Sequence, residues 1–498
     1  MKYNLIETND VLKSILDLNN ISLDDLYKDY DFLCNDEVFI KFKEELLKNK
    51  HLKFLIVGDF DADGIFATTI IKKLFIHLNI ENNFYIPSRI NEGYGLNSNI
   101  VEKAHNNGFN ALFLVDNGIK CKEEIEYANS LGIKVFIIDH HEFDKLPNAY
   151  IVHSNLVSSK YKDLSAAGLC YILTTLFFDD DYLCALAGLA TISDVMPVIG
   201  FNRILIKRMI NILKTNKYLH FNLLNDNNDF NYHNISFNII PKVNALSRME
   251  PLGNPNLLVK YLLSDNPNNA EFIENVNYIN EKRKNESKMM FNLAKTLMND
   301  DDVVLIVSKS FKEGLCGLVA GRLSDTFLKP VLVLSDNDEY VKGSGRSYGD
   351  FNLYNALKYF DGFDAFGGHE KAVGLTIKKD NLNGFIQYVK SIKVNEKELN
   401  KDVLLVDEDI LNYDFLELID GLMPFGPMFL KPEFAIKNNN YNKQIVSGRF
   451  AKYQIRNDLS AICFKEELKD IKAKYFIGSL RKDNYNKGSL QFLIEDLI

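Results

Sequence analysis

Three aspartates follow a short apolar run near the start of the chain. Residues 55–58 read Leu-Ile-Val-Gly, and Asp59, Asp61 and Asp63 then alternate over five residues. An apolar run that stops at a glycine predicts a buried strand with carboxylates at its carboxyl end. Carboxylates this close repel one another unless a cation lies between them, and oxygen ligands suit Mg²⁺ or Mn²⁺. We therefore expect a divalent metal site at the end of this strand.

The same residues also fit the start of an EF-hand calcium loop, whose pattern begins D-x-D-x-D-G. Such a loop ends with a glutamate at its twelfth position, where this sequence has Ile70. An EF-hand loop also follows a helix, whereas these aspartates follow a strand-like run. We therefore favour the metal site at a strand end over an EF-hand, and over a solvated acidic loop without metal.

Strand and helix patterns alternate from residue 51 onward. The predicted strands are 53–57, 84–87, 112–115 and 135–138, and the predicted helices are 65–78, 98–106 and 122–130. Such alternation predicts a parallel sheet with right-handed crossovers. Ligands of open α/β sheets bind beyond the carboxyl ends of the strands, so the polar residues that follow these strands should meet at one edge.

Acids and histidines do follow these strands. The third predicted strand precedes Asp116, and the fourth precedes Asp139, His140 and His141. Asp194 follows the apolar stretch 183–192; alone it would most often be a helix cap, but with the others it becomes a further carboxylate for metal. A bridging carboxylate can hold two cations about 3.5–4 Å apart, as displacement at phosphorus requires. The predicted metal ligands are Asp59, Asp61, Asp63, Asp116, His140 and Asp194.

Four motifs in this order, DFDADG, VDNG, DHH and SDVMP, resemble those of the DHH phosphoesterase superfamily. Further segments are similar to the RecJ single-strand exonucleases within it: IPSRINEGYG (86–95), PKVNALSRM (241–249), GLVAGRL, KGSGRS (342–347), FGGHEKAVG (366–374) and MPFGPMFLKPEF. The match runs from about residue 50 to 435. So many matching motifs along one chain are a far more specific signal than one D-x-D-x-D pattern.

The resemblance implies an α/β fold with a two-lobed parallel-sheet core, made of DHH and DHHA1 domains joined by a long helix. Short β-like runs after residue 400, such as AKYQI and SAICF, predict an OB-like β-barrel at the C-terminal end. Helical periodicity near the start predicts a helical lead-in. The expected segments are a helical N-terminal segment (1–48), the DHH catalytic domain (49–225), a helical connector (226–300), the DHHA1 domain (301–398) and the OB-like nucleic-acid-binding domain (399–498).

The resemblance also implies residue roles. Asp139 and His141 would orient ligands or contact phosphate, Asp116 is the best candidate to bridge the cations, and Asp59 either binds a cation or supports a residue that does. Lys312 stands where the family usually has a histidine. The predicted substrate-binding residues are Arg89, Asn244, Arg248, Arg283, Lys312, Ser344, Arg346, Ser347, Gly367, Gly368 and His369.

The activity implied is 5′→3′ hydrolysis of single-stranded DNA to mononucleotides, with two Mn²⁺ or Mg²⁺ ions, in DNA repair and recombination. One alternative is a DHH-family phosphodiesterase for short oligonucleotides or cyclic dinucleotides, which the length of the chain disfavours. Another is a non-catalytic replication scaffold on the same fold, which the intact acidic motifs disfavour. An assay on long DNA and on dinucleotides would separate these functions.

Composition agrees with an ordinary soluble globular protein. The 498 residues are 46% apolar and 25% charged, with a net charge of −9 that argues against nucleic-acid binding by the whole surface but allows a local basic groove. No apolar run approaches the roughly 18 residues of a membrane span, and the start carries no signal-peptide pattern. Six scattered cysteines without C-x-x-C predict reduced thiols. We expect a cytoplasmic monomer that binds single-stranded DNA, with a single-strand-binding protein or a helicase as candidate partner.

Overall fold

The structure is a computed structural model that describes residues 2–28, 30–227, 229–394, 400–468, 471–486 and 488–498. The chain separates into two units, each of which is described by itself. The larger unit contains Asp31–Met196 and Leu205–Glu396, and the smaller contains Met1–Tyr30, Pro197–Ile204 and Lys397–Ile498. The predicted boundary between residues 398 and 399 lies outside the described residues.

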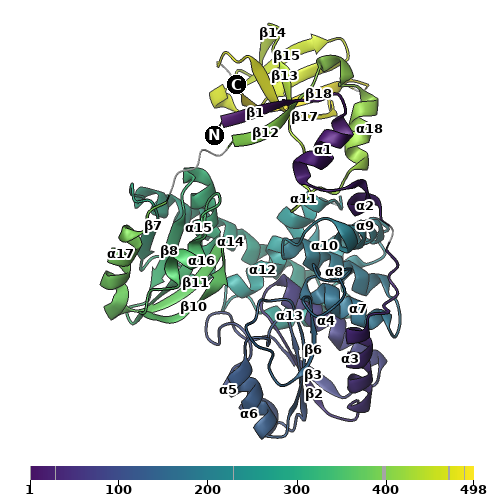
Figure 1. The fold of residues 1–498 in the computed structure, drawn as a ribbon, viewed down its shortest axis with the longest axis vertical. Helices are drawn as coiled ribbons and strands as arrows, with labels where there is room; N and C mark the ends of the chain where they lie inside the picture. The colour runs from purple at the N-terminus through teal and green to yellow at the C-terminus, as the bar shows by residue number, and fades with distance from the viewer. Residues whose placement is uncertain (1, 29, 228, 395–399, 469–470, 487) are drawn as a thin grey trace. The chain divides into compact units, whose positions relative to one another are not determined.

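A five-stranded parallel sheet lies at the base of the larger unit (Figure 1). Its strands, in spatial order, are β3 (Asn82–Tyr85), β2 (Phe54–Gly58), β4 (Ala111–Val115), β5 (Lys134–Asp139) and β6 (Tyr150–His153). The predicted parallel sheet is therefore confirmed, with β6 as an additional strand. The chain order reverses between β2 and β4, which is the topological switch point where ligands bind in such sheets.

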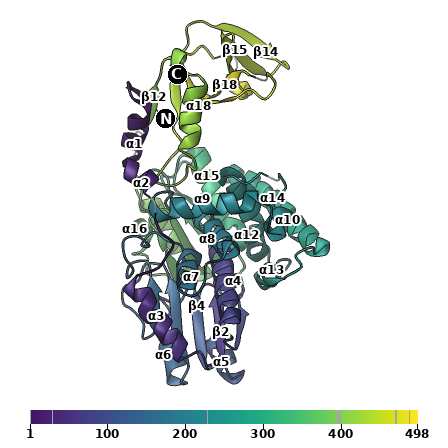
Figure 2. The ribbon, with the colours of Figure 1, turned by 90° about the vertical axis from the view of Figure 1, so that its right-hand side faces the viewer.

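Helices cover both faces of this sheet (Figure 2). Apolar residues of β2, β4 and β5 pack on one face against α5 (Ser98–Asn106) and α6 (Lys122–Ser130). The other face meets α3 (Glu37–Lys48), α4 (Ala62–His77) and α7 (Ala166–Thr175). Phenylalanines fill this second interface, with the rings of Phe54 and Phe75 centred 5.0 Å apart. Burial on both faces explains why these strands are continuous apolar runs.

A series of helices leads from this sheet to the second half of the larger unit. The long helix α14 (Ala270–Thr296) confirms the long helix predicted between the two lobes. The preceding elements are α8 (Asp181–Ser193), α9 (Gly200–Lys214), α10 (Leu219–Leu224), α11 (Tyr232–Asn234), the π-helix η1 (Ile235–Ile239), α12 (Ile240–Arg248) and α13 (Pro255–Leu263).

The second sheet of the larger unit is mixed, which corrects the expectation of parallel sheets in both lobes. Its strands, in spatial order, are β10 (Phe363–His369), β11 (Ala372–Lys378), β9 (Tyr340–Arg346), β8 (Val331–Asp336) and β7 (Val304–Ser308). Only β7 and β8 pair in parallel. Turns as short as residues 337–339 and 370–371 can join only antiparallel strands.

Three helices accompany this second sheet: α15 (Glu313–Phe327), α16 (Leu353–Leu357) and α17 (Leu382–Ser391), with the short 3₁₀ turn η2 (Lys379–Asn381) before the last. The glycine-rich segments KGSGRS and FGGH lie largely on β9 and β10.

The smaller unit is built on an eight-stranded sheet. Its strands, in spatial order, are β1 (Lys2–Glu7), β12 (Asn400–Leu405), β13 (Phe434–Lys437), β17 (Tyr475–Lys482), β18 (Leu490–Leu497), β16 (Leu459–Cys463), β15 (Phe450–Arg456) and β14 (Asn442–Val446). Its helical elements are α1 (Val11–Asn19), α2 (Leu23–Tyr27) and α18 (Tyr413–Gly421), and the 3₁₀ turns η3 (Glu408–Ile410) and η4 (Glu466–Leu468).

This sheet corrects two predictions. Residues 2–7 were expected to be helical, but they form β1, which pairs in parallel with β12. The predicted barrel is an open sheet, because within the described ranges β1 and β14 lie at its two edges and do not pair with each other. Closure of a barrel requires the two edge strands to join.

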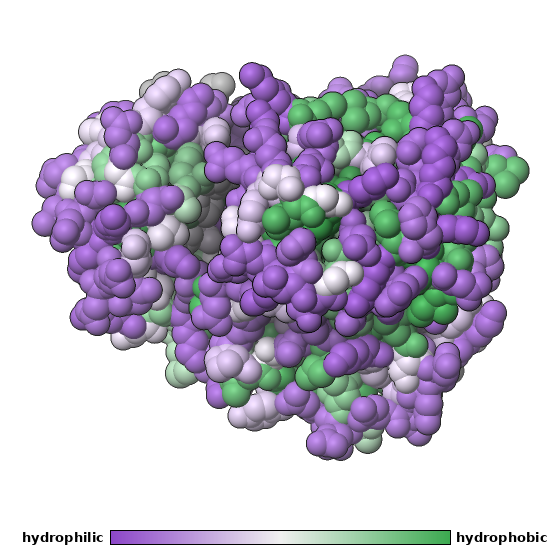
Figure 3. Space-filling model, turned by 90° about the horizontal axis from the view of Figure 1, so that it is seen from below, coloured by the Kyte–Doolittle hydropathy of each residue, from purple (hydrophilic) through white to green (hydrophobic). Residues whose placement is uncertain are grey.

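The surface shown in Figure 3 is mainly hydrophilic, with apolar residues in separate patches. In the part of the chain that the structure describes, no helix combines the length and the apolar character that a membrane span requires.

The side chain of Arg203, in the first part of α9 that belongs to the smaller unit, is a buried cation that holds a loop of the same unit. It is 0% exposed, and its guanidinium donates hydrogen bonds to the carbonyl oxygens of Pro424 (2.7 Å), Leu422 (2.8 Å) and Met423 (3.1 Å). Its charge also lies over the ring of Phe429, 5.2 Å from the ring centre. Burial lowers the pKa of Arg203 to about 10, so the side chain stays charged near neutral pH.

Replacing this side chain should destabilise the smaller unit. Arg203→Met keeps the apolar stem but leaves three carbonyl oxygens without their donor, two of them from buried hydrogen bonds, which costs about 3 kcal/mol of unfolding free energy. Differential scanning calorimetry should show a lower transition temperature. Lys214→Met, an exposed position on the same helix, is the matched control and should change stability by less than about 0.5 kcal/mol. Equal transition temperatures for both variants would contradict the role given to Arg203.

Candidate active site

The acidic loop after β2 is held by the start of α4. Asp61 is the N-cap of α4, and its carboxylate accepts hydrogen bonds from the N–H groups of Asp63 (3.0 Å) and Gly64 (3.2 Å). Gly64 lies against the backbone of Asp59, since a Cβ at position 64 would be 2.4 Å from the Asp59 carbonyl oxygen. This close turn keeps the three aspartates together at the carboxyl end of β2.

Three more predicted ligands come from separate elements. Asp116 follows β4 with a left-handed φ of 60°, Asp194 is the C-cap of α8, and His140 follows β5. The Nε2 atom of His140 lies 3.3 Å from an Asp116 oxygen, 3.5 Å from one of Asp194 and 3.8 Å from one of Asp63. The structure therefore brings residues from distant segments into one cluster at the sheet edge.

The ligand atoms form overlapping groups whose members lie within 4.8 Å of one another. These groups are Asp59, Asp61 and Asp116; Asp63, His140 and Asp194; and Asp116, His140 and His141. Asp116 belongs to two groups that otherwise share no residue. That is the position of a carboxylate that bridges two cations.

Burial makes negative charge on these carboxylates unfavourable unless a cation neutralises it. Asp59 and Asp116 are 4% and 2% exposed, and one oxygen of each lacks a hydrogen-bond partner among the described residues. Burial, followed by the charge of neighbouring carboxylates, raises the pKa of both side chains well above the ordinary value. The pKa of Asp194 is raised for the same reasons. Clustered, buried oxygen donors without partners fit the divalent cations that the sequence predicts.

Asp63 also holds a neighbouring helix. Its two oxygens accept hydrogen bonds from the N–H groups of Ala166 and Ala167, at 2.8 Å each, at the start of α7. Burial and the charge of Asp61 raise the pKa of Asp63 to about 7. Asp63 therefore joins α7 to the cluster of acids and histidines, and its carboxylate titrates near neutral pH when no cation is bound.

Both carboxylate oxygens of Asp139 accept hydrogen bonds from nearby residues. One oxygen accepts from the N–H groups of His140 and His141 and lies 2.7 Å from the Nδ1 atom of His141, while the other accepts from the N–H of Ile119. Burial opposes the charge of His141, but the bond to Asp139 prevails and raises the pKa of His141 to about 9. Asp139 therefore orients His141, and His141 is charged at neutral pH in the metal-free protein.

Tyr94 is a site residue that the sequence analysis missed. Its hydroxyl donates to the carbonyl oxygen of Asp116 at 3.1 Å and lies 3.1 Å from the Nδ1 atom of His141. It lies in the segment IPSRINEGYG, from which the resemblance predicts only Arg89 as a site residue. The Gly-Tyr-Gly sequence around Tyr94 was the available signal, because glycines on both sides let an aromatic residue approach a backbone closely.

Arginines gather beside the acids. Arg248 is close enough to Arg89 and Arg346 that, after burial, their repulsion lowers its pKa to about 9. The guanidinium of Arg89 lies over the ring of Phe60, 4.7 Å from the ring centre. None of these three arginines forms an ion pair with any residue that the structure describes. Partly buried guanidinium groups without an ion-pair partner are a site for an anion such as phosphate.

A groove of about 770 Å³ joins this cluster to the second sheet of the larger unit. Arg89, Tyr94 and His141 line one side of it. The other side comes from β9, β10 and β11, and includes Ser344, Gly367, Gly368, Gly374 and His369. Gly367 and Gly374 pair across the strands, and a Cβ at either would have no atom within 4 Å. The bare backbone of this wall therefore faces open space in the groove.

The remaining predicted substrate-binding residues have protein partners. Asn244 accepts a hydrogen bond from the N–H of Ala62 at 3.0 Å, and Arg283 donates to Asn280 at 3.0 Å. Lys312 pairs with Glu286 at 2.7 Å. The hydroxyl of Ser347 donates to the carbonyl oxygen of Phe351. The structure thus places Asn244 beside the acidic loop, whereas the Ser347 hydroxyl serves its own turn.

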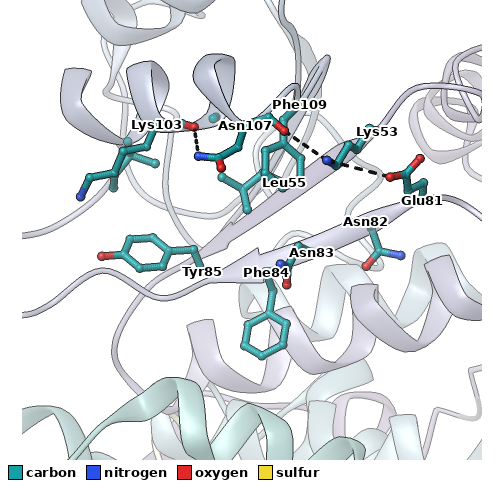
Figure 4. A pocket seen from close by; sticks show the side chains of 12 residues that line it. Lys53, Leu55, Glu81, Asn82, Asn83, Phe84, Tyr85, Lys103, Asn107 and Phe109 are labelled. Atoms are coloured by element: carbon teal, nitrogen blue, oxygen red, sulfur yellow. Dashed lines mark hydrogen bonds and ion pairs between the residues drawn. The ribbon is translucent and has the colours of Figure 1, made fainter.

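A second cavity of the larger unit, of about 560 Å³, lies away from these acids (Figure 4). It includes Lys53 and Asn82, which lie at the amino-terminal ends of β2 and β3. The Nζ atom of Lys53 already donates to the carbonyl oxygen of Asn107 at 3.1 Å and lies 4.0 Å from Glu81. Because the acids follow the opposite ends of the strands, this cavity lies in a different region from the cluster of acids and histidines.

Without metal, stability should depend on pH in a way that identifies the cluster. The pKa of Asp63 is about 7 in the folded protein and 3.8 as a reference value. The protonated carboxyl therefore stabilises the fold below pH 3.8, and this stability is lost as the pH rises from 3.8 through 7. In EDTA, the unfolding temperature should therefore fall as pH rises from about 4 to about 7. Asp59→Asn removes one buried charge and should make this fall shallower. Identical pH profiles for Asp59→Asn and the parent protein would contradict the raised pKa of Asp59.

Comparison with known proteins identifies both halves of the larger unit. Residues 53–192 match the DHH family, N-terminal domain, and residues 275–395 match the DHHA1 domain. The chain is 28% identical over 474 residues to the single-stranded-DNA-specific exonuclease RecJ of Bacillus subtilis, and 27% identical over 452 residues to RecJ of Escherichia coli. These alignments cover 88% and 81% of this chain, and 59% and 78% of the relatives.

The fold is also similar to a solved structure. The crystal structure of RecJ from Thermus thermophilus in complex with Mn²⁺ aligns with a TM-score of 0.84 at 20% sequence identity, covering 100% of this chain and 79% of that one. The resemblance found in the sequence motifs is confirmed. The chain therefore carries a DHH domain followed by a DHHA1 domain and is RecJ-like in both sequence and fold.

Proposed function

We propose that the chain is a metal-dependent exonuclease that degrades single-stranded DNA from its 5′ end to mononucleotides. One observation carries the proposal: within the described residues, a buried oxygen of Asp59 and one of Asp116 lack a hydrogen-bond partner, and they lie beside arginines without ion-pair partners. Asp61 and Arg248 are close enough to interact electrostatically. A phosphodiester with divalent cations satisfies both sets at once. The names of the B. subtilis and E. coli relatives point to single-stranded DNA as the substrate.

The chemistry divides between the cations and the side chains. When bound, two divalent cations activate water and offset the negative charge that develops on the phosphate. The side chains hold and orient: Asp139 fixes His141 through the 2.7 Å contact with its Nδ1 atom. Arg89, Arg248 and Arg346 would bind the scissile and flanking phosphates. This division leaves the protein with positioning and electrostatic stabilisation as its main tasks.

The groove fits a single strand of any sequence. The rings of Phe60 and Tyr94 on one side can stack with bases or sugars, and the bare backbone at Gly367 and Gly374 leaves room on the other. Stacking and backbone charge tolerate every base. The 5′→3′ direction is carried over from the family resemblance. We also propose that the enzyme acts as a cytoplasmic monomer in DNA repair and recombination, with a single-strand-binding protein or a helicase as partner.

Loss of the shared carboxylate should stop turnover without preventing DNA binding. Asp116→Asn removes the ligand common to two groups, and we expect cleavage at saturating Mn²⁺ to fall by about a thousandfold or more, because removal of a central electrostatic group costs on this scale. Anisotropy in EDTA should show DNA binding within about threefold of the parent. The exposed Asp325→Asn is the control and should cleave normally. Near-normal cleavage by Asp116→Asn would refute the site assignment.

End labelling tests polarity and the alternatives together. A 5′-labelled single strand should yield labelled mononucleotide at once, while a 3′-labelled strand should shorten gradually. Blunt duplex and circular single strands should resist. The reverse labelling pattern would refute the polarity. Cleavage confined to dinucleotides would favour the small-substrate phosphodiesterase, and binding without any cleavage in Mn²⁺ would favour the scaffold.

A further inference from the structure

The carboxylate of Glu250 holds the segment that carries Arg89. One of its oxygens accepts from the Ser88 hydroxyl at 2.5 Å and from the N–H of Ile90 at 3.5 Å, and the other accepts from the N–H of Arg89 at 3.3 Å. The Ser88 oxygen itself accepts from the N–H of Asn91 at 3.1 Å. The hydroxyl proton of Ser88 is therefore directed at Glu250, and every partner of this carboxylate is a donor.

A second carboxylate fixes the same segment from within. Glu92 accepts from the hydroxyl of Tyr85 at 2.6 Å and from the N–H of Ser88 at 2.9 Å. The segment is therefore attached to β3 through Glu92 and to the end of α12 through Glu250. Only the second attachment links it to the helix that carries Arg248.

The region around α12 also contacts the other two walls of the site. Asn244 accepts from the N–H of Ala62 at the start of α4, and the guanidinium of Arg248 lies 3.4 Å from the carbonyl oxygen of Gly314. A Cβ at Gly314 would lie 2.3 Å from the carbonyl oxygen of Arg248. The segment 244–250 therefore touches the acidic loop, the start of α15 and the Arg89 segment.

We propose that Glu250 is a positioning residue that holds Arg89 in register with Arg248 and Arg346 for phosphate binding. This inference rests on the proposed function, because it assigns Arg89 a place in substrate binding. Glu250 would act through the backbone of residues 88–90, with no contact to DNA. Arg89 has no ion pair in the described part of the chain, so its backbone anchors and its position over Phe60 decide where its charge lies.

Replacing the carboxylate of Glu250 by an amide removes its charge but keeps the size of the side chain, so the effect of the charge can be measured alone. Glu250→Gln keeps the length of the side chain, but its NH₂ group would face a donor, since all three partners donate. We expect about tenfold weaker binding of single-stranded DNA, the scale on which a hydrogen bond to a charged group is lost. KM should rise while kcat stays within about threefold, because the lost contact serves substrate binding. Glu250→Asp should recover part of the affinity.

A double-mutant cycle with Arg89→Ala tests whether Glu250 acts through Arg89. Binding of a fluorescent single-stranded oligonucleotide is measured by anisotropy in EDTA for the parent, Glu250→Gln, Arg89→Ala and the double variant. We expect Glu250→Gln to weaken binding about tenfold with Arg89 present and less than about twofold with Arg89 absent. Equal losses in both backgrounds, or no loss in either, would overturn the inference.

Two further measurements keep the inference distinct from the proposed function. Amide hydrogen exchange of residues 88–91 should be faster in Glu250→Gln than in the parent, and unchanged exchange would overturn the inference even if no DNA bound. Failure of the parent to bind or cleave single strands would refute the proposed function, leaving the exchange result to decide whether Glu250 holds the segment. Glu102→Gln, an exposed carboxylate on α5, is the matched control and should change neither measurement.

Discussion

Repulsion between buried carboxylates is the constraint on which this structure depends. The sheet order places the carboxyl ends of β2 and β4 side by side, so Asp59 and Asp116 meet where neither can reach water. The raised pKa of each side chain expresses the cost of that arrangement. Structures retain such a cost where the cluster has a use, and the use we propose here is to bind cations.

The arginines beside the acids are a second group of like charges, of the opposite sign. Burial and mutual repulsion lower the pKa of Arg248 to about 9, so positive charge is concentrated beside the negative cluster without being neutralised by it. An ion pair between the two sets would relieve both and leave nothing for a ligand. By keeping the two sets apart, the fold leaves each of them open to a charged ligand, as the proposed binding of cations and a phosphate requires.

The first sheet could be predicted from the sequence because each strand is a continuous apolar run buried on both faces. The predicted ligands follow the same logic, since residues after parallel strands reach one sheet edge. The orientation of the second sheet and the pairing of β1 could not be predicted, because partner choice is a tertiary property that a local pattern does not contain. Tyr94 and Glu250 were missed for the same reason: their partners lie 22 and more residues away in sequence. The Ser347 hydroxyl, predicted for substrate, is instead bonded within its turn.

The pairing of β1 with β12 has a consequence for the order in which the chain folds. Lys2 is opposite Asn400 in this pair, so β1 has to wait for a partner strand that is synthesised about 400 residues later. The entropic cost of closing so long a loop grows only slowly with its length. Even so, β1 cannot pair until β12 has been synthesised. Until then β1 is an unpaired strand, the kind of segment that invites association with other chains during synthesis. The DHH and DHHA1 halves, whose strands pair with near neighbours, are under no such delay.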